Sequence, residues 1–152
     1  MAAALASELR TRGVDVEVLE SDVLRRIFTP QPRYDEAERD AFYRQIAYIG
    51  ALLARHGVAV IFDATANLRT YRDRARQQIP RFLEVHVDTP LEVCMSRDPK
   101  GIYRDGRAVP GLQAAYEPPL YPDLVIHGDQ ERPESAARRI IATLIDSRTI
   151  SA

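Results

Sequence analysis

Residues 58–63 read Val58-Ala59-Val60-Ile61-Phe62-Asp63, five apolar residues that end at a carboxylate, and this stretch decides the fold. An unbroken apolar run of strand length is typical of a strand that is covered on both faces of a parallel sheet. Ligands of such sheets bind beyond the carboxyl ends of the strands. We therefore expect Asp63 to lie at the edge of the sheet that carries the functional site.

Strand and helix patterns alternate on both sides of this run. Further strands are predicted over residues 14–19, 82–87 and 124–126, and helices over residues 2–12, 36–55, 67–79, 89–97 and 133–146. The alternation predicts one doubly wound parallel α/β sheet. Residues 98–122 are rich in proline and glycine and show little periodicity, which predicts a long functional loop or lid.

The composition excludes several classes of protein. A chain of 152 residues is the size of one domain, and a formal charge of -1 gives no basis for non-specific binding to nucleic acid or an anionic membrane. Lys100 is the only lysine, so arginine carries the positive charge, and its guanidinium suits carboxylates and phosphates. A single cysteine, Cys94, fits a reducing compartment, and no apolar run approaches the ~20 residues of a membrane span. We expect a cytoplasmic protein.

Two aspartates follow predicted strands, Asp22 after the first and Asp63 after the second. A carboxylate at the end of a buried strand is the residue that holds Mg²⁺ in P-loop phosphotransferases. Asp22 has the chemistry of a general base toward a substrate hydroxyl. For both residues the alternative is an aspartate that only caps a turn.

Three stretches carry a resemblance to a known family. Residues 82–94 read FLEVHVDTPLEVC, residues 97–103 read RDPKGIY, and residues 116–123 read YEPPLYPD. They resemble the adenylyl-sulfate kinases, and the resemblance covers nearly the whole chain. It implies a P-loop nucleoside-triphosphate kinase fold and the use of ATP and Mg²⁺. The implied reaction phosphorylates the 3′-hydroxyl of the small-molecule substrate adenosine 5′-phosphosulfate, a step of sulfate assimilation.

The resemblance also implies roles for individual residues. Taken singly, most arginines are also compatible with a solvated helix face. The matched residues are Asp22 as catalytic base; Arg25, Tyr34, Arg39 and Arg44 for the substrate; Arg97, Lys100 and Arg104 for the nucleotide and the mobile lid; and Asp63 for the metal. Members of the family are commonly dimeric, so a homodimer is expected.

The phosphate-binding loop of the family, G-x-x-x-x-G-K-S/T, does not occur in the sequence. The strand before that loop is the first of the family's sheet and lies at its centre, and it has no counterpart here either. Unpaired backbone groups on the flanking strands would each cost ~1 to 3 kcal/mol. We therefore expect residues 1–152 to be a single domain of this family that is truncated at its N-terminus, with its lid at about residues 98–122.

Other departures concern the substrate. They are Glu20 in place of an aspartate, Phe42 in place of an asparagine, Ala66-Asn67 in place of Ser-Pro, and Val109 in place of a phenylalanine that stacks on adenine. Residues 63–67, with Arg69, also resemble an element of P-loop kinases that phosphorylate polynucleotide ends and small metabolites. Two alternatives thus stay open: a kinase for another hydroxyl acceptor, and a catalytically inactive nucleotide-binding module or partner of an intact subunit.

Overall fold

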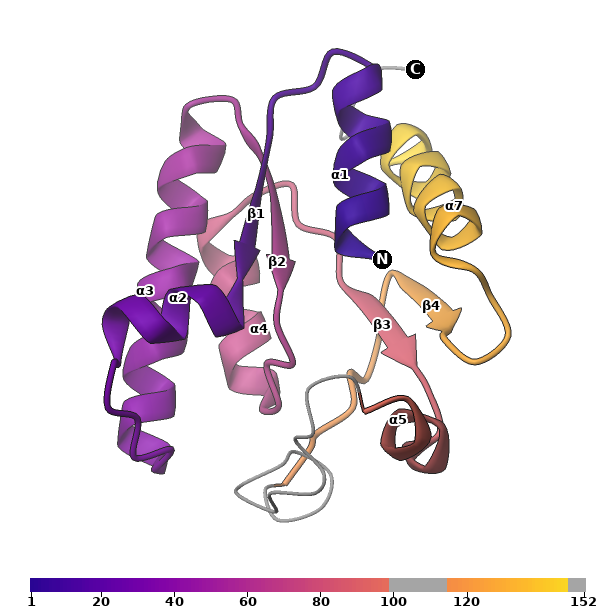
Figure 1. Cartoon of the computed structure of the whole chain (residues 1–152). Coiled ribbons are helices and arrows are strands. Elements are labelled where there is room, and N and C mark those ends of the chain that lie inside the picture. The colour runs from indigo at the N-terminus through magenta and orange to yellow at the C-terminus, as the bar shows by residue number, and fades with distance from the viewer. Residues whose placement is uncertain (99–114, 148–152) are drawn as a thin grey trace.

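The computed structural model describes residues 1–98 and 115–147. Helices and strands alternate along these residues (Figure 1). The strands are β1 (Val16–Glu20), β2 (Ala59–Asp63), β3 (Val85–Asp88) and β4 (Leu124–His127), and the helices are α1 (Ala2–Thr11), α2 (Ser21–Phe28), α3 (Glu36–Arg55), α4 (Arg69–Gln78), α5 (Leu91–Arg97) and α7 (Pro133–Asp146). Both strand pairings are parallel, which confirms the predicted α/β class.

The four strands form two separate parallel pairs. β1 pairs with β2 in a register that sets Val16 opposite Ala59, and β3 pairs with β4 with Val85 opposite Leu124. Within the described residues, neither β2 nor β3 pairs with a strand of the other pair. This arrangement agrees with the expectation that the central strand of the family's sheet has no counterpart in the chain.

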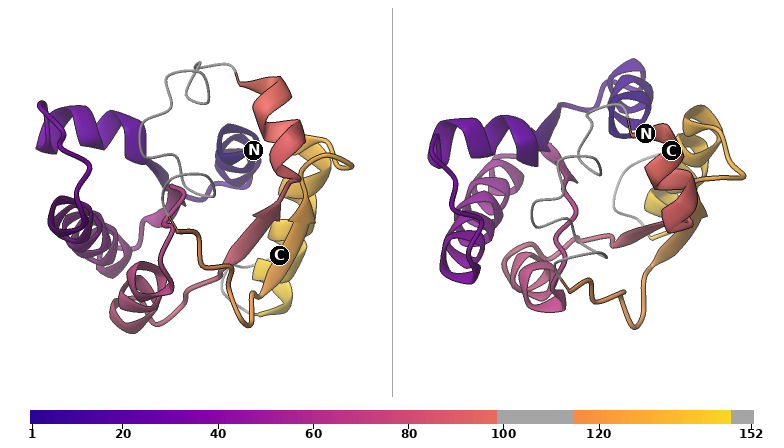
Figure 2. Two further views of the ribbon diagram at one scale, coloured as in Figure 1. Left: turned by 90° about the horizontal axis from the view of Figure 1, so that it is seen from below. Right: turned by 60° about the horizontal axis from the view of Figure 1, so that its bottom comes forward.

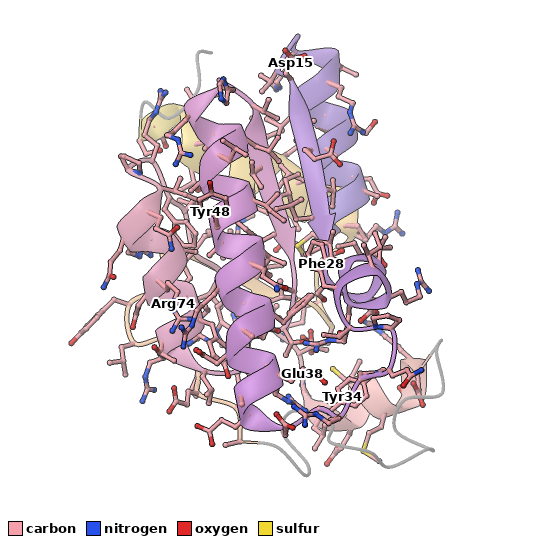
Figure 3. All side chains as sticks on the ribbon, turned by 90° about the vertical axis from the view of Figure 1, so that its left-hand side faces the viewer. Asp15, Phe28, Tyr34, Glu38, Tyr48 and Arg74 are labelled. Carbon is pink, nitrogen blue, oxygen red and sulfur yellow. The ribbon has the colours of Figure 1, made fainter. Side chains whose placement is uncertain are left out.

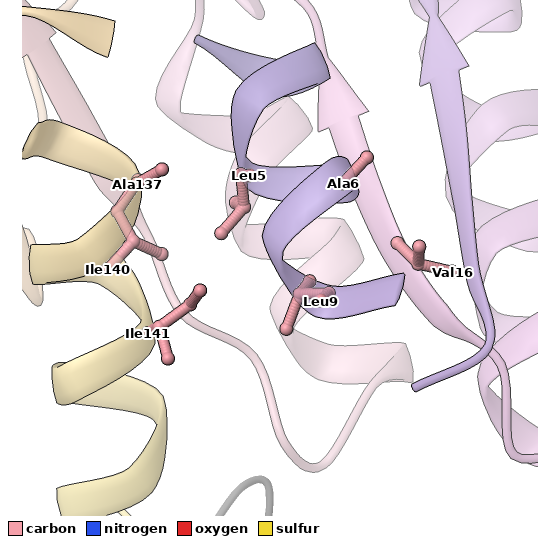
Figure 4. Close-up of a cluster of buried hydrophobic side chains, with 7 residues drawn as sticks. All are labelled: Leu5, Ala6, Leu9, Val16, Ala137, Ile140 and Ile141. Carbon is pink, nitrogen blue, oxygen red and sulfur yellow. The ribbon is translucent and has the colours of Figure 1, made fainter. Parts of the chain in front are cut away.

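Helices α1 and α7 cover one face of both pairs. Leu5 and Leu9 of α1 are buried against Ile140 and Ile141 of α7 (Figure 4). The same cluster includes partly buried residues from or next to both strand pairs: Val18, Ala59 and Ile61 on one side and Leu83, Val85 and Leu124 on the other. Apolar side chains of α1 and α7 therefore hold the two pairs together.

The opposite face is covered by α3 and α4. Asp35 caps α3 by accepting a hydrogen bond from the Glu38 amide at 2.8 Å. Gly50 lets this helix approach the sheet closely, because an added Cβ would overlap the ring of Phe62 on β2. The packing fixes α3 next to β2, so its N-terminal half lies near the carboxyl edge of the sheet.

Two regions differ from the predicted elements. The third strand begins at Val85 instead of residue 82, and residues 21–28, for which no helix or strand was predicted, form α2, an eight-residue helix without a buried residue. Most of the predicted lid, residues 99–114, lies outside the described residues, and residues 115–122 contain neither helix nor strand. In the described part of the chain no helix has the length and apolar character needed to cross a membrane.

Candidate active site

The carboxyl ends of β1 and β2 bring two predicted acidic residues to one edge. Asp63 is the last residue of β2 and lies opposite Glu20, the last residue of β1. β1 runs directly into α2, and Asp22 lies in the first turn of that helix, where the helix dipole favours a negative charge. Among the described residues no group of three or more His, Cys, Asp or Glu side chains is suited to hold a metal ion.

Arg25 of α2 is enclosed by aromatic and acidic side chains. Its guanidinium carbon lies 4.1 Å from the ring centroid of Phe42 and 5.5 Å from that of Tyr34. Its Nη1 atom donates to Oε1 of Glu38 at 3.3 Å, and the two side chains are only 15% and 10% exposed. Phe42, which stands where the family has an asparagine, is fully buried beneath this guanidinium.

Tyr34 lies at the same corner, just before the start of α3 and close to Glu38 (Figure 3), and Arg39 follows Glu38 in α3. Tyr34 has a positive φ of 59°, and the residue is 44% exposed. Arg39 donates through Nε to the Tyr34 carbonyl at 3.1 Å. The structure thus brings together Arg25, Tyr34 and Arg39, three of the four residues that the sequence assigned to the substrate.

Arg44 has a different environment. It is five residues after Arg39, which places it about 140° further around the helix. Its Nε donates to Asp40 at 2.7 Å, and Arg74 of α4 donates to the other oxygen of the same carboxylate at 2.9 Å. Hydrogen bonds from Arg44 and then Arg74 lower the pKa of Asp40. The role of Arg44 toward the substrate stays a prediction.

The loop after β2 is clamped at Ala66, which has a positive φ of 40°. The Ala66 amide donates to the hydroxyl of Tyr43 at 3.0 Å, and its carbonyl accepts from Arg72. The rings of Tyr43 and Tyr71 stack at 4.4 Å, and burial raises the pKa of Tyr43. Side chains of α3 and α4 therefore fix the backbone three residues after Asp63.

Residues 115–117 are bound to this loop. The side chain of Asn67, which is 5% exposed, donates to the Ala115 carbonyl at 2.8 Å, and the Glu117 amide donates to the Asn67 carbonyl at 2.8 Å. Arg72 also donates to the Glu117 carbonyl and to the carboxylate of Glu84. The position that carries proline in the family is here an asparagine whose side chain anchors residue 115.

The residues predicted for the nucleotide and lid are only partly described. Arg97, the last residue of α5, donates to the Gly128 carbonyl at 2.7 Å, close to the end of β4. Lys100, Arg104 and Val109 lie outside the described residues. Figure 2 shows α5 and α7 on one side of the molecule and α2 and α3 on the other.

Sequence reasoning missed three residues that organise this edge: Glu38, Tyr43 and Arg72. A signal for Glu38 existed, since Asp35 and Glu38 have the spacing of a capping box. Tyr43 and Arg72 gave no comparable signal, because their partners are backbone groups of a loop more than five residues away. Their roles follow only from the packing of α3 against α4.

A parallel α/β sheet that gathers carboxylates and arginines at one edge is the architecture of the P-loop kinase class. A solved structure of this class, the Mycobacterium tuberculosis APS kinase CysC in complex with AMPPNP and APS, superposes with a TM-score of 0.85 at 30% identity. The superposition covers 94% of this chain and 87% of that one.

Sequence comparison identifies the family. A family model described as adenylylsulphate kinase matches residues 1–127. The adenylyl-sulfate kinase of Synechococcus sp. strain JA-3-3Ab is 42% identical over 126 residues, which span 80% of this chain and 72% of the relative. That of Synechococcus sp. strain JA-2-3B'a(2-13) is 39% identical over 136 residues, 86% of this chain and 78% of the relative. The chain belongs to the adenylyl-sulfate kinase family, and it is a kinase-like phosphotransferase.

Proposed function

We propose that the protein transfers the γ-phosphoryl group of ATP to the 3′-hydroxyl of adenosine 5′-phosphosulfate. The products are 3′-phosphoadenosine 5′-phosphosulfate and ADP. The observation that carries the proposal is the cluster of Arg25, Tyr34 and Arg39 beside Asp22, because it combines an aromatic face with guanidinium groups. An aromatic face suits a purine base, and guanidinium groups suit phosphate and sulfate oxygens. A relative in complex with APS and the ATP analogue AMPPNP supports the same assignment.

Asp22 is the proposed general base. Its carboxylate accepts the proton of the 3′-hydroxyl while the 3′ oxygen forms a bond to the γ-phosphorus. The bond between that phosphorus and the β–γ bridging oxygen breaks, and ADP leaves with the electron pair. Arg25, Tyr34 and Arg39 hold the acceptor in place. In such a reaction positioning and charge stabilisation supply most of the rate enhancement.

The residues at this edge fit a magnesium ion. Mg²⁺ prefers oxygen ligands, and protein sites commonly supply only one or two carboxylates while substrate phosphates and water complete the shell. Asp63 would hold it, and Asp22 is near the end of the adjacent strand. When bound, the ion neutralises charge that develops on the phosphoryl oxygens.

The experiment that tests the function combines turnover with choice of acceptor. A purified protein in which a G-x-x-x-x-G-K-S/T loop precedes residue 1 is expected to form the 3′-phosphorylated product from Mg-ATP and adenosine 5′-phosphosulfate, and ion-pair chromatography separates this product from substrate. A polynucleotide with a free 5′-hydroxyl serves as the competing acceptor. Phosphorylation of the polynucleotide alone would refute the proposed acceptor.

A second candidate function is a catalytically inactive module that binds the acceptor nucleotide. The observation in its favour is that G-x-x-x-x-G-K-S/T does not occur in the 152 residues. The turnover assay distinguishes it from the first proposal: such a module binds adenosine 5′-phosphosulfate in isothermal titration calorimetry but gives no product with Mg-ATP.

A further inference from the structure

Glu38 links the parts of the acceptor cluster to one another. Its Oε1 atom accepts from Nη1 of Arg25 at 3.3 Å and from the Tyr34 amide at 3.4 Å. Its Oε2 atom accepts from the Arg33 amide at 2.7 Å. One carboxylate on α3 therefore holds both a side chain of α2 and the backbone that leads into α3.

This use of the carboxylate differs from an ordinary capping box. In that motif the third residue of the helix bonds back to the amide of the N-cap residue. Glu38 instead reaches past Asp35 to the two amides before it. The Glu38 carboxylate thus binds the backbone of the segment that contains Tyr34.

The contacts of Glu38 oppose two unfavourable features of the cluster. Tyr34 has a φ of 59°, a conformation that a residue with a Cβ adopts only when its surroundings enforce it. Arg25 is 15% exposed, so its charge is largely removed from water and requires a partner. Without Glu38, the tyrosine backbone and the guanidinium each lose a contact that holds them where they are.

We propose that Glu38 is a positioning residue of the acceptor site, which keeps Arg25 and Tyr34 in the arrangement that binds the adenylyl nucleotide. The inference rests on the proposed function, since it assumes that this cluster receives adenosine 5′-phosphosulfate. Glu38 acts through its neighbours and does not itself contact the ligand.

The sign of a charge change separates this role from a simple electrostatic one. The ligand is an anion, so loss of a nearby negative charge by itself strengthens binding. Glu36→Gln is the matched control, because it removes the same charge from the first turn of the same helix, where the side chain is exposed. If Glu38 is a positioning residue, Glu38→Gln weakens binding in spite of the more favourable charge.

The test is calorimetric titration of adenosine 5′-phosphosulfate into the protein and its variants. Glu38→Gln is expected to raise Kd about tenfold, the effect of losing one hydrogen bond to a charged group. Glu38→Asp keeps the charge but shortens the side chain, and we expect an intermediate Kd. Glu36→Gln is expected to leave Kd unchanged or slightly lower. A Kd for Glu38→Gln equal to or below that of Glu36→Gln would overturn the proposal.

Amide hydrogen exchange gives a readout that needs no ligand. Glu38→Gln, or Glu38→Asp where the first variant does not fold, is expected to speed exchange at the Arg33 and Tyr34 amides, while Glu36→Gln leaves both rates unchanged. Failure of the wild-type protein to bind the nucleotide refutes the proposed function, whereas unchanged exchange at these two amides refutes the positioning role.

Discussion

Replacing Tyr43 by phenylalanine removes one hydroxyl and keeps the ring that stacks on Tyr71. The lost oxygen accepts the Ala66 amide at 3.0 Å, in a region that is partly buried. Leaving a buried donor without its partner costs about 1–3 kcal/mol, and partial access of water to Ala66 favours the lower half of that range. At about 2–4 °C per kcal/mol for a domain of this size, we expect Tm to fall by about 2–8 °C.

Thermal unfolding followed by circular dichroism measures this loss. Tyr71→Phe is the matched control, because it removes a hydroxyl from the other ring of the stacked pair and leaves the Ala66 amide bonded. Hydrogen exchange at the Ala66 amide is expected to accelerate in Tyr43→Phe and not in the control. The reasoning is refuted if both variants lose the same stability or if the Ala66 amide exchanges at the wild-type rate.

Three further outcomes are expected. The motif G-x-x-x-x-G-K-S/T supplies the backbone amides and the lysine that bind the ATP phosphates, and it does not occur in residues 1–152. Millimolar Mg-ATP is therefore expected to leave the Tm of this chain nearly unchanged. A ligand at 100 times its Kd stabilises a protein by ~2.7 kcal/mol, so a clear rise in Tm would contradict this expectation. In a protein in which a G-x-x-x-x-G-K-S/T loop precedes residue 1, Asp63→Asn is expected to lower kcat about 100-fold at saturating magnesium if the carboxylate holds the ion. Unchanged turnover would mean that Asp63 caps a turn, a role that asparagine fills equally well. The pKa of Asp40 is lowered in the folded protein from its ordinary 3.8, so its ionised form stabilises the fold above pH 3.8, and this stabilisation is lost as the pH falls below that value. Asp40→Asn is therefore expected to make the fall of Tm at acidic pH less steep. A fall as steep as that of the wild-type protein would contradict this expectation.

The fold was largely predictable because its strands are short runs that are either apolar or alternate between apolar and polar residues. Val58–Phe62 has few alternatives to a buried strand, and the neighbouring patterns set the alternation with helices. Helix α2 was missed since none of its residues is fully buried and no side chain caps its start. Its position is set by the end of β1 and by the contact of Arg25 with Glu38, which is tertiary information.

The candidate site was predictable as a set of residue types and not as a geometry. The sequence marks Asp22 and Asp63 as strand-end carboxylates, and the structure places both at one edge. Nothing in the sequence indicates that Tyr34 has a positive φ, that Arg39 reaches the Tyr34 carbonyl, or that Arg74 of α4 binds the same carboxylate of Asp40 as Arg44. Those facts depend on rotation around α3 and on its approach to α4.

The contacts between Asn67 and residues 115–117 have a consequence for how the two strand pairs are coupled. Asn67 follows β2 and residues 115–117 precede β4, so their two hydrogen bonds join the backbone after one pair to the segment that leads into the other. Arg72 adds hydrogen bonds to the Ala66 and Glu117 carbonyls, one on each side of this junction. Because these contacts are contiguous, a displacement of residues 115–117 is transmitted to the backbone that follows Asp63.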